Sequence, residues 1–167
     1  MSLYGSVTPA EGRGRIHPTI PVSVQDPFSL EIRVCDVDVN IATAVIAVND
    51  ALQRAGCRMR SSHSCQGAEV EPGTVVGYIG FDSPVRPPEA YEEGRKAYDL
   101  LSRVSARIAP SMSAGLDIEV SAVFRCNPRP EEAGFLGMTL TVYVAGKHAG
   151  ETLKEVWLRF GSELAQA

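Results

Sequence analysis

Residues 28–56 read FSLEIRVCDVDVNIATAVIAVNDALQRAG, and within this stretch a strand pattern gives way to a helix pattern. Apolar and polar side chains alternate over residues 28–35, which predicts a half-buried β-strand. Over residues 41–55 the apolar residues recur at helical spacing and form one stripe, which predicts an amphipathic helix. Asp36 or Asp38 stands where the cap of that helix is expected, because a carboxylate there can accept a backbone N–H and favours the helix dipole.

The rest of the chain repeats these two patterns. Strand patterns occupy residues 57–64, 75–81, 116–124 and 138–144, and helix patterns occupy residues 88–108 and 151–164. Short connections between neighbouring strands imply antiparallel pairs, and helices with one apolar stripe cover one face of a sheet. Trp157 lies on such a stripe and is expected in the core. We therefore predict an α+β fold with a mainly antiparallel sheet, helices packed on one face and the element order β-α-β-β-α-β-β-α.

Residues 1–27 are rich in glycine and proline and poor in large apolar side chains, which predicts an irregular N-terminal arm. The remaining residues, 28–167, have the length and composition of a single α+β domain. The arm either hangs free as a loose tail or packs on a neighbouring subunit. In the second case the protein would be a homo-oligomer.

The composition of the chain limits the kinds of protein to which it can belong. Its 167 residues include 16 Lys and Arg against 20 Asp and Glu, a net charge of -4. Phosphate contacts need a basic excess, so this balance disfavours a nucleic-acid partner. The chain has no apolar run long enough to cross a membrane, and residues 1–14 lack the pattern of a signal peptide. We predict a soluble, cytoplasmic protein whose cysteines stay reduced.

The most unusual local sequence is RSSHSCQG at residues 60–67, which strand propensity does not explain. We predict that residues 61–67 form a loop able to bind a small ligand or carry catalysis. Cys65 and His63 are the catalytic candidates, because residues two apart in an extended chain share a face and a thiol needs a neighbouring cation to become reactive. The ligand-binding candidates are Ser62, Ser64, Gln66 and Gly67. The alternative is a buried or half-buried cysteine beside a surface histidine.

Metal and cofactor sites have little support in the sequence. Cys57, His63 and Cys65 offer three ligand atoms, and Cys35 or Cys126 would supply a fourth. Structural zinc sites usually show two close pairs of ligands. That spacing does not occur here, so we predict no metal site. The common motifs of nucleotide-binding proteins, hydrolases and metalloproteases do not occur either, and no cofactor is predicted.

One part of the chain resembles known proteins. Asn49 and Gly56 precede the string SCQG at residues 64–67, and the strand GYIGF follows at residues 77–81. This arrangement resembles small prokaryotic and phage proteins of unassigned role, in which an SCxG string precedes a YIxF strand. It is also distantly similar to the wybutosine-synthesising tRNA methyltransferase family, in which a helix leads into a Ser-Ser-Cys-Ser-Gly stretch.

Two functional hypotheses remain open. The first is a non-catalytic binding or assembly protein that oligomerises through the N-terminal arm and an exposed sheet edge. The second, which the resemblance implies, is an enzyme or ligand-binding domain centred on residues 61–67 that acts on a small ligand, a nucleotide or RNA. This sequence has Gln66 and Ala68 where the methyltransferase family has a serine and a basic residue. A concave pocket around Cys65 would favour the second hypothesis, and a flat or packed placement would favour the first.

Overall fold

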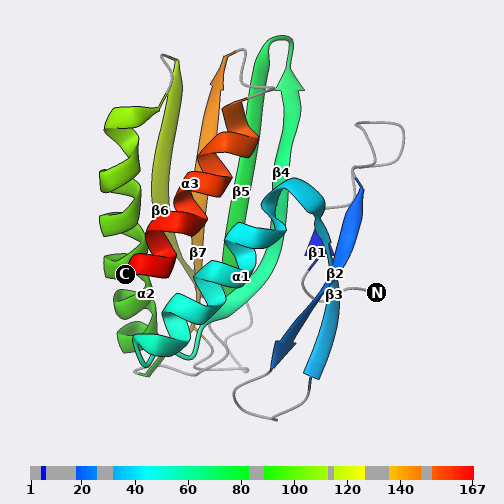
Figure 1. Cartoon of the computed structure of the whole chain (residues 1–167). Helices are drawn as coiled ribbons and strands as arrows, with labels where there is room; N and C mark the ends of the chain where they lie inside the picture. The colour runs from blue at the N-terminus through cyan, green and yellow to red at the C-terminus, as the bar shows by residue number, and fades with distance from the viewer. Residues whose placement is uncertain are drawn as a thin grey trace.

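The computed structural model of the protein describes residues 5–6, 18–25, 32–82, 89–112, 115–126, 136–147 and 152–167. The main sheet has five strands in the order β1-β4-β5-β7-β6, and β2 and β3 pair into a separate two-stranded ribbon (Figure 1). The strands are β1 Gly5–Ser6, β2 Thr19–Gln25, β3 Ile32–Asp38, β4 Arg60–Glu71, β5 Thr74–Asp82, β6 Leu116–Cys126 and β7 Leu136–Lys147. Among these strands only β1 and β4 pair in parallel, and the other pairs are antiparallel.

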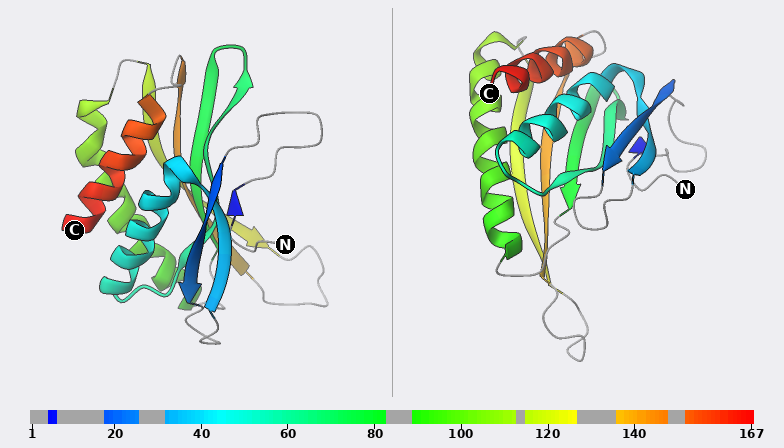
Figure 2. Two further views of the ribbon diagram at one scale, coloured as in Figure 1. Left: turned by 45° about the vertical axis from the view of Figure 1, so that its right-hand side comes forward. Right: turned by 60° about the horizontal axis from the view of Figure 1, so that its bottom comes forward.

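Three helices lie on one face of the main sheet. They are α1 Val39–Arg54, α2 Glu89–Ile108 and α3 Thr152–Gln166, and the short 3-10 helix η1 Ala109–Ser111 follows α2. Figures 1 and 2 show α1 and α3 crossing this face, while α2 runs along its β6 side. The predicted α+β class, the mainly antiparallel sheet and the helices on one face are confirmed. The predicted order β-α-β-β-α-β-β-α begins at β3, and β1 and β2 precede it. None of the described helices is long and apolar enough to cross a membrane.

Strand alternation separates the two faces of the main sheet. Ile79 of β5 and Val142 of β7 are opposite each other and fully buried beneath the helices. Their sequence neighbours Tyr78 and Tyr143 are also opposite each other and belong to the other face. Figure 2 shows that no described helix covers this second side, which we call the open face. Among the described side chains of the open face, Tyr143, Asp117 and Glu119 are exposed, whereas Cys65 and Thr141 are buried.

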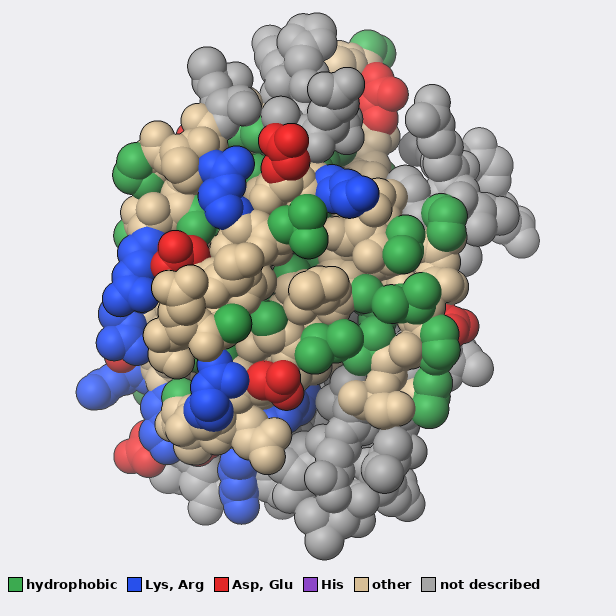
Figure 3. All heavy atoms as spheres, in the orientation of Figure 1, with side chains coloured by type: hydrophobic (Ala, Val, Ile, Leu, Met, Phe, Trp, Pro, Cys, Tyr) green, Lys and Arg blue, Asp and Glu red, His purple; other side chains and the backbone are tan. Residues whose placement is uncertain are grey.

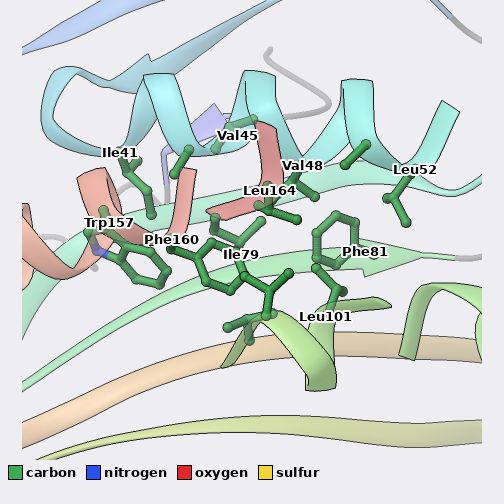
Figure 4. Close-up of a cluster of buried hydrophobic side chains, with 14 of the residues drawn as sticks. Ile41, Val45, Val48, Leu52, Ile79, Phe81, Leu101, Trp157, Phe160 and Leu164 are labelled. Carbon is green, nitrogen blue, oxygen red and sulfur yellow. The ribbon is translucent and has the colours of Figure 1, made fainter. Parts of the chain in front are cut away.

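The core lies between the main sheet and the three helices. Its largest buried side chains come from every layer, and Figure 4 shows the cluster formed by Ile41, Val45, Val48, Leu52, Ile79, Phe81, Leu101, Trp157, Phe160 and Leu164. The rings of Trp157 and Phe160 pack edge to face with their centroids 6.1 Å apart. Trp157 is fully buried, as its place on the apolar stripe predicts. Each such side chain contributes roughly 1.5–3 kcal/mol by leaving water.

The prediction of an irregular arm over residues 1–27 is wrong for residues 5–6 and 19–25, which form β1 and β2. Apolar residues alternate in β2 as they do in the other strands, but prolines within and before the segment interrupt the sequence signal. Val22 is 4% exposed, and the Pro18 carbonyl accepts the Val39 N–H at 2.9 Å. The segment is thus attached to the start of α1. Apart from residues 5–6, the earlier part of the predicted arm lies outside the described residues.

The strands on either side of α1 are displaced from their predicted positions. β3 ends at Asp38 and not at residue 35, and β4 runs from Arg60 to Glu71 and not over residues 57–64. Asp38, for example, still pairs with Thr19 of β2. Backbone hydrogen bonds extend a strand wherever a partner strand continues, whatever the side chains are.

Candidate functional site

The stretch predicted as a site loop, residues 61–67, lies inside strand β4, so the prediction of a loop is wrong. Ser61 is opposite Phe81 of β5, and Cys65 is opposite Tyr78. Propensity scales describe how side chains fit a sheet, whereas the ladder itself is made of backbone groups that serine, histidine and glycine also supply. The polar stretch is therefore part of the framework of the sheet.

Strand β4 divides the candidate residues between two faces. Ser61 and Ser64 face the helices and are each only 2% exposed. The positions of His63 and Cys65 belong to the open face. The structure therefore separates Ser64 from Cys65. The side chains of Ser62 and His63 lie outside the described residues, so the pairing of His63 with Cys65 stays a prediction.

Asn49 of α1 holds the beginning of β4. Its Oδ1 accepts the Ser61 N–H at 2.9 Å, and the residue is 9% exposed. A buried N–H without an acceptor costs about 1–3 kcal/mol, so this bond ties the helix to the strand. Asn49 belongs to the pattern that carries the family resemblance, and in this chain it has a structural contact.

A β-bulge interrupts β4 directly after Cys65. Gly67 has a φ of +151°, and a Cβ at this position would lie 2.5 Å from Cδ1 of Leu153 in α3. On the neighbouring strand, a Cβ at Gly77 would lie 2.7 Å from the carbonyl oxygen of Gln66. Both glycines therefore permit a close approach that a side chain would block. Gly67, predicted as a ligand-binding residue, allows β4 to pack under α3.

Gln66 lies in this bulge and is bonded to two helices. Its backbone N–H donates to Oδ2 of Asp38 at 3.0 Å, and its carbonyl accepts the Nε1–H of Trp157 at 2.8 Å. Its side-chain Oε1 accepts the N–H of Asn40, in the first turn of α1, at 3.3 Å. These bonds satisfy a helix-terminal N–H and a buried indole N–H. A ligand-binding role for Gln66 stays a prediction.

Asp38 stands at the cap position of α1, as predicted, but its carboxylate makes no capping bond. It is 1% exposed and accepts the Gln66 N–H instead. The Gln66 side chain accepts the helix-terminal N–H of Asn40 instead, so Gln66 takes the capping role that the local sequence predicts for Asp38. Asp36 lies within β3 and is exposed.

Cys65 is 6% exposed and lies beside Tyr78 on the open face. Burial raises the pKa of its thiol, the Gly67 N–H opposes this shift, and the charge of Asp38 adds to it. The thiol is therefore protonated at neutral pH, and a protonated thiol is a weak nucleophile. Catalysis by Cys65 stays a prediction. It would need a cation to lower the pKa of the thiol, and that cation would have to come from outside the described side chains.

Cys57 lies just before β4, where its thiol donates to the Glu93 carbonyl at 3.3 Å. The Glu93 carboxylate accepts the Arg58 N–H at 2.6 Å. Burial raises the pKa of Cys57 to about 11, and nearby Glu93 adds to the shift. Cys57 and Cys65 are both free thiols. Within the part of the chain that the structure describes, no group of three or more His, Cys, Asp or Glu side chains is placed to hold a metal ion.

The sequence did not single out a row of side chains across the open face. Register places Glu119 of β6, Tyr143 of β7, Tyr78 of β5 and Cys65 of β4 side by side. The rings of Tyr78 and Tyr143 have centroids 6.2 Å apart and planes inclined at 53°. Burial raises the pKa of Tyr78 to about 12, and Cys65 and Tyr143 add to the shift, so this phenol is neutral at physiological pH. Alternation predicts which residues share a face, but register decides which of them meet.

Comparison of the chain with protein-family models, curated proteins and solved structures finds no match. The resemblance to the wybutosine-synthesising methyltransferase family and to the small prokaryotic and phage proteins therefore stays a prediction.

Proposed function

We propose that the protein is a non-catalytic binding protein that assembles with a second copy through the β2–β3 ribbon. The observation that carries this proposal is the exposure of apolar side chains on the ribbon and the adjoining start of α1. Val34 is 61% exposed, and Val39 at the start of α1 is 42% exposed. Ile20 is 38% exposed but lies opposite Val37, on the face of the ribbon that joins the core. Figure 3 shows hydrophobic side chains gathered over this part of the molecule. Clustered apolar exposure of this kind marks contact surfaces.

Among the described side chains of the ribbon, one face joins the core, and the other face has buried Asp38 at its end and exposed Val34 farther along. Val22 and Val37 are buried and join the core beside α1. Val34 occupies the opposite face of the ribbon, because it pairs with Ser23 at the alternate register position. A two-stranded ribbon is marginally stable alone, so apolar cover on its second face would stabilise it.

The proposed contact is made by the side chains of the ribbon and not by a strand edge. The Pro18 carbonyl accepts the Val39 N–H, so residues 18 and 39 form a hydrogen-bonded pair. Because bonded and non-bonded pairs alternate along an antiparallel ladder, Pro21 and Asp36 form a non-bonded pair, and the backbone groups of Pro21 point away from β3. Proline has no N–H, which disfavours addition of another strand at that edge. At the other end of the molecule, α2 runs beside edge strand β6 (Figure 1). The sequence prediction of assembly through a sheet edge is replaced here by a contact through side chains.

Sedimentation velocity of the full chain over about a hundredfold range of concentration tests this proposal, because association depends on concentration. We expect a dimer that Val34→Asp dissociates. The matched control is Leu158→Asp, since Leu158 is 46% exposed but lies on α3. A chain that stays monomeric throughout, or two variants that dissociate equally, would refute assembly through the ribbon.

A second candidate function is the binding of a small ligand, a nucleotide or RNA near residues 61–67. It is favoured by the neighbouring rings of Tyr78 and Tyr143, because aromatic faces can stack on bases. The exposed carboxylates of Asp117 and Glu119 on the same face repel phosphates, so this candidate ranks second. Titration of the tyrosine fluorescence with adenosine monophosphate and with a short single-stranded RNA tests it. We also propose a cytoplasmic location, because the buried thiols of Cys57 and Cys65 are free and a reducing compartment keeps thiols in that state.

A further inference from the structure

The β6–β7 side of the open face combines an exposed aromatic ring with two carboxylates. Tyr143 is 39% exposed. Glu119 is directly opposite it on β6, and Asp117, two residues earlier, is opposite the small side chain of Ala145. Both carboxylate residues are exposed, and strand alternation places them on the same face as the tyrosine. No described helix covers this side of the sheet (Figure 2).

Each of these features favours a cation. Side chains directly opposite each other in an antiparallel pair have Cβ atoms about 5 Å apart, so a single ligand can touch the Tyr143 ring and the Glu119 carboxylate together. An aromatic ring attracts a cation to its face. Asp117 and Glu119 are like charges on one face, and a cation between them relieves their repulsion. The small side chain of Ala145 leaves room beside the ring.

We propose that this surface, made of Tyr143, Glu119 and Asp117, binds an arginine carried by an extended segment of a partner protein. Arginine fits better than lysine, because a planar guanidinium stacks on a ring while its N–H groups pair with a carboxylate. The neighbouring ring of Tyr78 is inclined at 53° to that of Tyr143 and widens the aromatic surface toward β5. Its phenol is neutral, so among the described side chains of this row the charge comes from the two carboxylates.

This site is separate from the ribbon surface proposed for assembly. Tyr143 and Glu119 belong to β7 and β6 at one side of the main sheet, whereas the ribbon lies beside β1 and β4 at the other side (Figure 1). Val34→Asp should therefore leave arginine binding unchanged, and loss of the proposed dimer would not affect this inference.

Fluorescence anisotropy with a labelled acetyl-(Gly-Arg)4-amide peptide tests the proposal on the full chain. We expect Tyr143→Ala and Glu119→Gln each to weaken binding about fivefold. The matched controls are Tyr98→Ala, since Tyr98 is 40% exposed on α2, and Glu155→Gln, which removes the same charge from exposed Glu155 on α3. Both controls should change the affinity by less than about twofold. Unfolding curves of each variant test whether it is folded.

Three results would overturn the inference. Equal losses in the matched controls would show that the peptide responds to net charge alone. Equal affinity for acetyl-(Gly-Lys)4-amide would show that the guanidinium is not recognised. Unchanged binding by the double variant Glu119→Gln with Asp117→Asn would exclude the carboxylates, and this variant removes only exposed charges, so its folding is not at risk.

Discussion

Strand β4 and the β2–β3 ribbon show opposite relations between polarity and burial. In β4 the hydroxyl residues Ser61 and Ser64 are each 2% exposed, whereas in the ribbon the apolar Val34 is 61% exposed. Strand β4 has partners on both sides and above it, including Asn49 of α1 and Trp157 of α3. In the described part of the ribbon, Val22 and Val37 join the core on one face, and Val34 is exposed on the other. Burial therefore follows the number of partner elements, and the side-chain type does not predict it here.

The difference assigns different roles to the two regions. Buried polar groups with hydrogen-bond partners hold α1 and α3 on the sheet, so changes in β4 should reduce stability. Exposed apolar groups cost little when altered in the folded monomer, so changes in the ribbon should affect association. The following substitutions and conditions measure this contrast, from the largest expected effect to the smallest.

Gly77→Ala should reduce the free energy of unfolding by about 3 kcal/mol, because its Cβ would lie 2.7 Å from the Gln66 carbonyl oxygen and a backbone atom cannot move aside. Urea unfolding measures the change. Gly161→Ala is the control, since its Cβ would lie 3.4 Å from the Ala44 Cα in ordinary contact and alanine favours the helix. A stable Gly77→Ala protein would show that the bulge in β4 relaxes freely.

Asn49→Ala should cost about 2 kcal/mol, because the buried Ser61 N–H loses its acceptor. Hydrogen exchange at the Ser61 amide should accelerate in the same variant. The neighbouring exposed residue offers a control, and Asp50→Ala should stay within about 0.5 kcal/mol of the wild type. Unaltered exchange at Ser61 would mean that β4 does not depend on α1.

Alkaline pH should reduce the stability that the buried contacts next to β4 provide. The pKa of Cys57 is raised from 9.0 to about 11, so the unfolded chain loses this proton first as the pH rises. The stabilisation is complete below pH 9.0 and is lost as the pH rises toward 11, with a fall of about 1–2 kcal/mol by the middle of that window. Cys57→Ser keeps a donor for the Glu93 carbonyl but does not titrate there, and this variant should show a smaller fall. Parallel pH curves for the two proteins would contradict the role of the Cys57 thiol.

Val34→Ser should change the free energy of unfolding by less than about 0.5 kcal/mol at low protein concentration, because Val34 is 61% exposed. Val22→Ala, on the buried face of the same strand pair, should cost about 2 kcal/mol. Thermal and urea unfolding compare the two variants. A large loss in Val34→Ser would show that the ribbon is covered from both sides within one chain.

The element order could be predicted because its signals are local. The apolar stripe of α1 and the alternation of β6 are each contained in one segment, and the structure has both. The candidate site was harder to predict, because the contacts of Gln66 join residues 26, 28 and 91 positions apart in the chain. A local pattern of small polar residues predicts a loop, and it does not change when a distant helix packs on the segment and holds it in a sheet.

The amino-acid sequence by itself determined the fold class, the helices and most strands, because hydrophobic periodicity and turn residues act over a few neighbouring positions. Tertiary structure alone decided that residues 61–67 form a bulged strand, that the Asp38 carboxylate binds Gln66, and that Glu119, Tyr143 and Tyr78 form one row. Those outcomes depend on strand register and helix docking. Register and docking minimise the free energy of the whole assembly of elements, and no single segment contains that information.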